Sequence, residues 1–246
     1  MISTKHPKIK FKLDAKKDIN TFFDFSTDAK DDDGRILRWA ILKKYPILKK
    51  QFNGFDFVGE KSFIEVFVHN LYEKNHQVMQ KNLDAYDKDW GKIEKEFYHL
   101  TDSLFPLQNW PSGKYVSFLT VWGMYPRFLE DKTFQIPFKL KEKKYVNVII
   151  AHEMLHFIFY NYFLRKYPEY KENDNFVWHV SEIFNVIIQN LPKWMAVFKA
   201  PSFAYPEHEK IVIKIQKENK SDWNVDELIE RIMTEVRNSP LIVSNR

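Results

Sequence analysis

The stretch VIIAHEMLHFIFY, residues 148–160, places His152, Glu153 and His156 inside an otherwise apolar run. Ionisable side chains are rarely buried in such a run unless a partner compensates for their lost hydration. On a helix, two histidines four residues apart project from one face, where their imidazoles can supply two ligands to a metal ion. The alternative is a core helix with structural histidines. The stretch favours a buried helix with a metal-binding face.

Glu153 directly follows the first histidine, so it lies about 100° further round the helix axis. From that position it cannot easily bind the same ion, but it can reach a water molecule beside the ion. A pair of histidine ligands with a neighbouring glutamate base is the arrangement of His-Glu-x-x-His metallohydrolases. The motif therefore indicates hydrolytic chemistry as well as metal binding.

The rest of the chain predicts a folded protein with a large apolar core. Its 246 residues are 44% hydrophobic and 17% aromatic, which is too apolar for a disordered chain. We predict an α+β fold, mostly helical, with a small antiparallel or mixed sheet preceding the helix that carries the motif. Three regions are expected: a mainly helical region at 1–110, a core at 111–192 and a mainly helical region at 193–246 that packs on the same globule.

Hydrophobic periodicity places the elements of this fold. Residues 61–105 repeat their apolar positions every three or four residues, and Gly91 suggests a join between two helices. In the last helix, Asn224 is expected as N-cap, with Glu227 three residues later completing a capping box. Strands are expected within 114–123 and 127–140, with LEDK as a hairpin turn, and helices at 144–166, 176–191 and 224–236.

HEMLH on an apolar helix, followed by WHVSEIFNVIIQN on a second helix, resembles the zincin metallopeptidases, and among them the gluzincin branch. The resemblance covers about residues 112–192. It implies a zincin-like fold in which His152 and His156 are zinc ligands, Glu153 is the general base and Glu182 is the third ligand. The metzincin extension is absent, because the chain reads FIFYNYF where that branch has glycine and histidine.

Two parts of this assignment leave alternatives open. The context of Glu182 lacks the Asn-Ala lead-in of the best-known gluzincins, and His179, one turn earlier on the same face, is a rival third ligand. Gluzincins often stabilise the oxyanion with a tyrosine or histidine after the third-ligand helix, and FAYPEH offers Tyr205 and His208 there. An ordinary aromatic turn is the alternative for that segment.

The function that follows is a zinc-dependent metallopeptidase acting on peptide or protein substrates. One alternative is a regulatory or binding protein on a degenerate zincin fold, although the intact Glu153 argues against it. Another is a DNA-associated zinc protease, suggested by the net charge of +5. The 38 basic residues are, however, interleaved with 33 acidic ones, a pattern that favours a solvated surface over one that binds nucleic acid.

Three features of the sequence bear on where in the cell the protein is located. Residues 146–164 are about as long as the roughly 20 residues that cross a bilayer. The ionisable side chains of His152 and Glu153 in their midst argue against a membrane span. The chain has no cysteine, and its first residues contain no apolar stretch typical of a signal peptide. A cytoplasmic location is expected, and the oligomeric state stays open.

Overall fold

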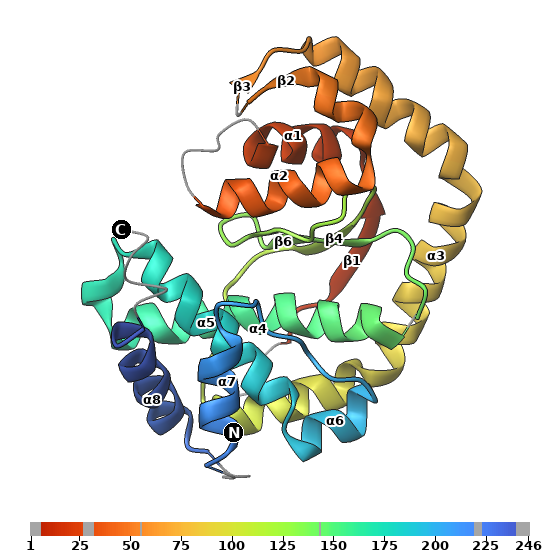
Figure 1. The fold of residues 1–246 in the computed structure, drawn as a ribbon. Helices are drawn as coiled ribbons and strands as arrows, with labels where there is room; N and C mark the ends of the chain where they lie inside the picture. Colours follow the sequence, from red (N-terminus) through yellow and green to blue (C-terminus); the bar gives the residue numbers. More distant parts are fainter. Residues whose placement is uncertain (1–5, 27–31, 55, 143, 219–222, 240–246) are drawn as a thin grey trace. The chain divides into compact units, whose positions relative to one another are not determined.

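The structure, a computed structural model, describes all residues except 1–5, 27–31, 55, 143, 219–222 and 240–246; for 32–37 it describes the backbone alone. It is an α+β fold, mostly helical, with a small mixed sheet, as the sequence predicts (Figure 1). The chain forms two compact units. Unit 1 comprises Met1–Pro7, Asp89–Gly113 and Glu142–Arg246, and unit 2 comprises Lys8–Lys88 and Lys114–Lys141. The division into three sequence regions stays a prediction.

Unit 2 is built on a four-stranded sheet in the order β1-β4-β6-β5. The strands are β1 (Ile9–Leu13), β4 (Tyr115–Thr120), β5 (Arg127–Phe128) and β6 (Thr133–Pro137). β4 pairs in parallel with both β1 and β6, whereas β5 and β6 are antiparallel. Helices α1 (Ala15–Ser26) and α2 (Asp32–Lys44) lie on one side of this sheet (Figure 1).

Two features of the sheet bear on the sequence predictions. Phe128 pairs with Thr133, so LEDK forms the connection of a hairpin, as expected. Lys132 closes that connection with φ of 54°. Strand β1 lies within residues 1–110, where the sequence predicts no strand. The alternation of apolar and charged residues in IKFKL is nevertheless typical of a strand with one buried face.

Helix α3 (Lys61–Leu104) runs without interruption, so the predicted join at Gly91 is wrong. A glycine inside a helix is about 1 kcal/mol less favourable than alanine, and packing on both sides of Gly91 offsets this. Trp90 and Phe97 are buried, with ring centroids 5.2 Å apart. The short helix η1 (Pro46–Gln51) and the hairpin of β2 (Phe52–Asn53) and β3 (Asp56–Phe57) precede α3.

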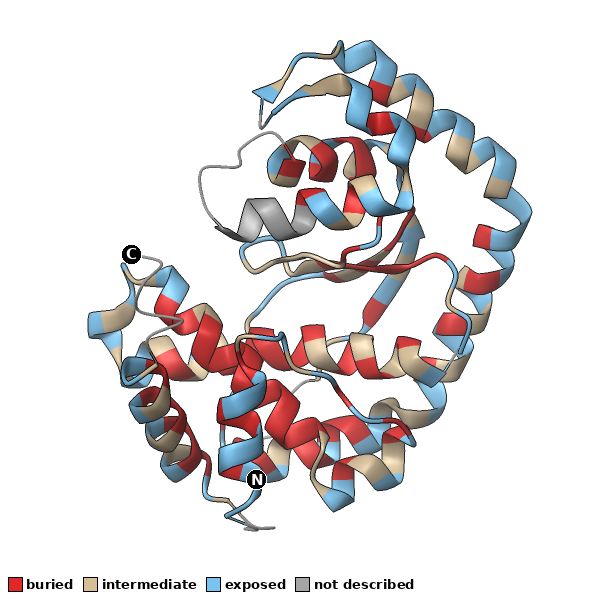
Figure 2. Cartoon of the chain, in the orientation of Figure 1, coloured by how far each residue is buried: buried red, intermediate tan, exposed pale blue. Residues whose placement is uncertain are grey.

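Unit 1 contains the helices that carry the motif. They are α4 (Lys144–Lys166), η2 (Pro168–Tyr170), α5 (Asp174–Gln189), α6 (Pro192–Phe198), α7 (Glu209–Gln216) and α8 (Val225–Arg237). α4 has the predicted bounds. Asn173 caps α5 by accepting a hydrogen bond from the backbone N–H of Phe176, and Asn224 caps α8 as predicted. The middle of α4 and most of α5 are buried (Figure 2), so Glu153, His156 and Glu182 lie among apolar side chains.

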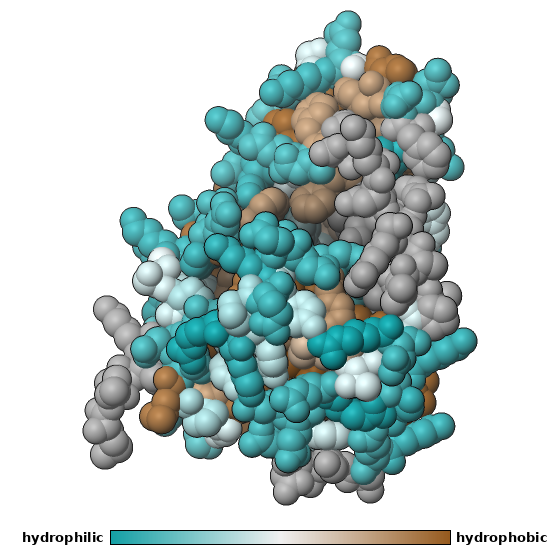
Figure 3. Space-filling view, turned by 90° about the vertical axis from the view of Figure 1, so that its left-hand side faces the viewer, coloured by the Kyte–Doolittle hydropathy of each residue, from teal (hydrophilic) through white to brown (hydrophobic). Residues whose placement is uncertain are grey.

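The surface and the helices agree with two further expectations. On the face drawn in Figure 3, hydrophilic side chains predominate, as expected from closely mixed acidic and basic residues. Within the described part of the chain, no helix has both the length and the apolar character that crossing a bilayer requires.

Candidate metal centre

Three side chains of α4 and α5 converge within unit 1. His152 and His156 come from α4 and Glu182 from α5, and each offers a ligand atom within 4.8 Å of the other two. The Nε2 atom of His152 lies 3.0 Å from one carboxylate oxygen of Glu182, and Nε2 of His156 lies 3.4 Å from the other. Each oxygen of the carboxylate therefore faces one imidazole.

The cluster is buried except at His152. Glu182 is 3% exposed and His156 is fully buried, whereas the side chain of His152 keeps 16% of its surface accessible. Apolar neighbours on α4, including Met154 and Leu155, are also fully buried. A carboxylate in such surroundings is unfavourable unless a positive group compensates for it. Of the three described ligand candidates, His152 is the most exposed.

Gln189, two turns after Glu182 on α5, fixes the tautomer of His152. Its amide nitrogen donates to the backbone carbonyl of Val148 at 2.9 Å, which determines the orientation of the amide. Its amide oxygen therefore faces Nδ1 of His152, also at 2.9 Å. Since that oxygen can only accept, Nδ1 of His152 must carry the proton.

In the neutral imidazole of His152, Nε2 therefore carries no proton, and its lone pair is directed at an oxygen of Glu182. Two acceptors 3.0 Å apart repel each other unless a cation or a proton lies between them. Burial alone lowers the pKa of His152, but the hydrogen bond and charge of Glu182, with smaller effects of Glu153 and Gln189, raise it overall. The site thus attracts positive charge, and two imidazole nitrogens with a carboxylate form a donor set that suits zinc.

Asn185 holds the two helices together at this point. Its side-chain nitrogen donates to the backbone carbonyl of His152 at 3.0 Å, so it ties α5 to the turn of α4 that presents the first histidine. Together with the Gln189 contacts, this bond fixes both the backbone and the ring of His152. Supporting contacts of this kind orient metal ligands and raise their affinity.

Glu153 is buried on α4 beside the cluster but does not belong to it. Its charge acts on His152, where it helps to raise the pKa. The expectation that Glu153 is a neighbour of the ion and not a ligand stays a prediction.

His179, the rival third ligand, lies outside the cluster of three. Its Nδ1 atom lies 2.7 Å from Nε2 of His208, the residue directly before α7, and both rings are buried. The pKa of each ring is lowered to about 4, mainly by burial. For His208 the neighbouring His179 contributes to this lowering. The geometry therefore favours Glu182 over His179 as the third ligand.

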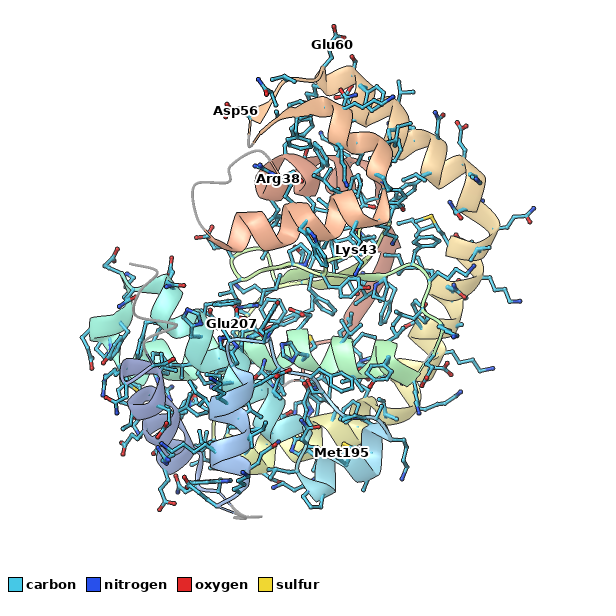
Figure 4. The ribbon with its side chains drawn as sticks, viewed as in Figure 1. Arg38, Lys43, Asp56, Glu60, Met195 and Glu207 are labelled. Atoms are coloured by element: carbon cyan, nitrogen blue, oxygen red, sulfur yellow. The ribbon has the colours of Figure 1, made fainter. Side chains whose placement is uncertain are left out.

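The segment FAYPEH leads into α7, and Figure 4 labels Glu207 within it. Tyr205 is partly exposed, and its ring packs against Trp178 and His208 at centroid distances of 5.4 and 5.7 Å. The structure thus brings Tyr205, His208 and His179 together in an aromatic group at the start of α5. It does not place Tyr205 or His208 in the cluster of His152, His156 and Glu182.

Sequence reasoning missed Gln189. A signal was present, because a residue seven positions after Glu182 lies on the same helix face and is therefore directed toward α4. Glutamine in a stretch as apolar as VIIQ would have been the residue to test.

Comparison of the chain with protein-family models, with curated proteins and with solved structures gives no match. The likeness to zincins therefore rests on the motif and on the geometry of its residues.

Proposed function

We propose that the protein is a zinc-dependent metallopeptidase in which His152, His156 and Glu182 hold the ion. The arrangement around His152 carries this proposal. Gln189 keeps a proton on Nδ1, so neutral His152 directs its Nε2 lone pair at the carboxylate of Glu182, an arrangement that requires either a proton or a metal cation between the two, and we assign the cation. A purely structural zinc site would normally have four protein ligands, whereas the described residues supply three to this group.

A zinc ion in this position supplies Lewis acidity, which lowers the pKa of an attacking water to about 7 and polarises the scissile carbonyl. His and Glu ligands also accept other divalent ions, so zinc is the specific choice of the proposal. We also retain the expected cytoplasmic location as part of the proposal.

Glu153 is the proposed general base. It is fixed on the same helix as both histidines, one residue after His152, and its charge reaches the site. It accepts the proton of the attacking water and passes it to the leaving amine. Neither step requires Glu153 to bind the ion.

Metal content provides the first test. We expect protein purified without chelator, or titrated with zinc, to bind one equivalent by elemental analysis. Glu182→Ala and His156→Ala should abolish this stoichiometric binding. His179→Asn is the matched control on the same helix and should keep the zinc. Failure of the unaltered protein to take up zinc would overturn the proposal.

Hydrolysis is tested separately with the zinc-loaded protein and a library of internally quenched peptides. Glu153→Gln should keep one zinc and lose hydrolysis by several orders of magnitude, because the amide cannot accept the proton. A protein that holds zinc but cleaves no peptide would instead be a metal-containing binding protein. Since the same preparation yields both measurements, the two outcomes are cleanly separated.

A further inference from the structure

The buried pair of His179 and His208 has a defined direction of proton donation. One of the two facing nitrogens, Nδ1 of His179 or Nε2 of His208, must donate and the other must accept. The second nitrogen of His208, Nδ1, is buried and has no hydrogen-bond partner among the described residues. An N–H group buried without an acceptor is rarer than a buried lone pair. The proton of neutral His208 therefore lies on Nε2, from which it is donated to His179.

The tautomer of His179 follows from this direction. Because its Nδ1 accepts from His208, the proton of a neutral His179 ring is on Nε2. The two nitrogens of an imidazole point away from each other, so this N–H group is directed away from His208. His179 lies one turn before Glu182 on α5, and the charge of Glu182 acts on both rings of the pair. What connects the donor with the proposed zinc site is therefore this spacing, which puts His179 on the same face of α5 as Glu182.

We propose that His179, through its Nε2–H group, is the donor that stabilises the oxyanion of the substrate, and that His208 is the positioning residue that keeps the proton on Nε2. The inference rests on the metallopeptidase function proposed above. A neutral imidazole is an effective donor of this kind, since it polarises a carbonyl without transferring a full charge. The lowered pKa values of both rings keep the pair neutral at pH 7.

This assignment changes the expected role of the FAYPEH segment. His208 is fully buried, so it acts through His179 and not on the substrate. Trp178 lies beside both rings, with centroids 4.7 Å from His179 and 5.4 Å from His208, and helps to hold the pair. Tyr205 packs at the edge of the same group, so its hydroxyl is the rival donor.

Nuclear magnetic resonance tests the tautomers without reference to activity. Long-range ¹⁵N–¹H spectra of histidine-labelled, zinc-loaded protein at pH 7 should show the proton of His179 and that of His208 on Nε2. His179→Gln and His208→Gln assign the two signals. A proton on Nδ1 of His179 would overturn the inference whether or not the protein hydrolyses peptides.

Kinetics test the catalytic role in the same zinc-loaded protein. His179→Gln should lower kcat by about 100- to 1000-fold, with KM, zinc content and melting temperature little changed. His208→Gln keeps an amide that can donate to Nδ1 of His179 and should retain most of kcat. His208→Leu cannot donate and should lose about 10- to 100-fold. Tyr205→Phe should keep kcat.

The outcomes separate this inference from the proposed function. If the unaltered zinc-loaded protein cleaves no peptide, the metallopeptidase proposal fails, and the donor role of His179 fails with it. If it cleaves peptides and His179→Gln is fully active, or Tyr205→Phe is the inactive variant, the inference alone is overturned. Loss of zinc in His179→Gln would also overturn it, because that result would make His179 a ligand.

Discussion

The two units each bury a carboxylate, and the partners of the two groups differ in kind. In unit 2, Asp18 is fully buried and accepts four hydrogen bonds from uncharged donors of the same unit. These are the hydroxyl of Thr120 at 2.6 Å, the amide of Gln135 at 2.8 Å, the hydroxyl of Tyr72 at 2.9 Å and the backbone N–H of Val121 at 3.0 Å. Burial raises its pKa to about 6 even so, and the four donors restrain that rise.

Glu182 in unit 1 faces two imidazole nitrogens, Nε2 of His152 and Nε2 of His156. In the neutral ring of His152, Nε2 carries a lone pair and no proton. The chain thus supplies neutral donors to Asp18, whereas Nε2 of His152 donates to Glu182 only when its ring is protonated. Neutral donors complete a structural hydrogen-bond network, whereas a carboxylate that faces an imidazole lone pair requires a metal cation or a proton between them. The difference explains why one buried acid belongs to the core and the other to a candidate metal site. Four predictions test it.

The largest effect is expected for Asp18→Ala. Removal of the carboxylate leaves buried donors unsatisfied, each at about 1–3 kcal/mol, so the free energy of unfolding of unit 2 should fall by about 5 kcal/mol. Hydrogen exchange within 8–88 and 114–141 measures it. Tyr72→Phe, which removes one donor and no acceptor, should lower it by about 1 kcal/mol. Equal, small effects of both substitutions would contradict a central structural role for Asp18.

Metal removal should act on unit 1 instead. With free zinc at a thousand times its dissociation constant, binding stabilises the native state by about 4 kcal/mol. Chelation should therefore accelerate hydrogen exchange in α4 and α5, and Glu182→Ala should make exchange there insensitive to zinc. Asp18→Asn is the control that keeps the response. An identical response to zinc in the unaltered protein and in Glu182→Ala would refute the assigned ligand.

Acidification should stabilise unit 2 and destabilise unit 1. Burial raises the pKa of Asp18 from 3.8 to about 6. Its contribution to the stability of unit 2 is therefore fully present below pH 3.8 and is lost as pH rises through about 6, a difference of about 3 kcal/mol. For His179 and His208, whose pKa values are lowered from 6.5 to about 4, the contribution is present above pH 6.5 and is lost as pH falls toward 4.

Hydrogen exchange corrected for its intrinsic pH dependence can follow both units between pH 4 and 7. Unit 2 should gain protection toward acid, and Asp18→Asn should remove that gain. Unit 1 should lose protection over the same range. Parallel slopes in the two units would show that other groups dominate the pH dependence.

The smallest effect is expected for Gln189→Met, which keeps the size of the side chain but no longer holds Nδ1 of His152. Loss of such a supporting contact lowers metal affinity by about 10- to 100-fold, or roughly 2 kcal/mol. Competition with a zinc-binding dye measures this change. Asn190→Ala, on the adjacent residue, is the control, since its side chain bonds with Ser202 and not with the cluster. An unchanged zinc affinity in Gln189→Met would show that Gln189 does not support metal binding through the tautomer of His152.

The predictions of secondary structure were confirmed where a signal within the segment itself was enough to define the element. The apolar run around His152 defined α4, the LEDK turn defined the β5–β6 hairpin, and Asn224 marked the start of α8. The predictions failed where distant packing decided. Strand β1 pairs with β4 about a hundred residues later, and no local pattern names that partner. Gly91 lies inside a continuous helix because packing outweighs its weak helix propensity.

The sequence by itself indicated a candidate metal-binding face, because the spacing of His152 and His156 on a helix fixes their common face. It also determined that Glu153 lies beside that face. Only the tertiary structure decided between Glu182 and His179 as the residue that completes the cluster, and only it revealed the role of Gln189. Both choices depend on how α5 is rotated against α4. That rotation is set by the packing of apolar side chains from several helices, which no spacing within one helix encodes.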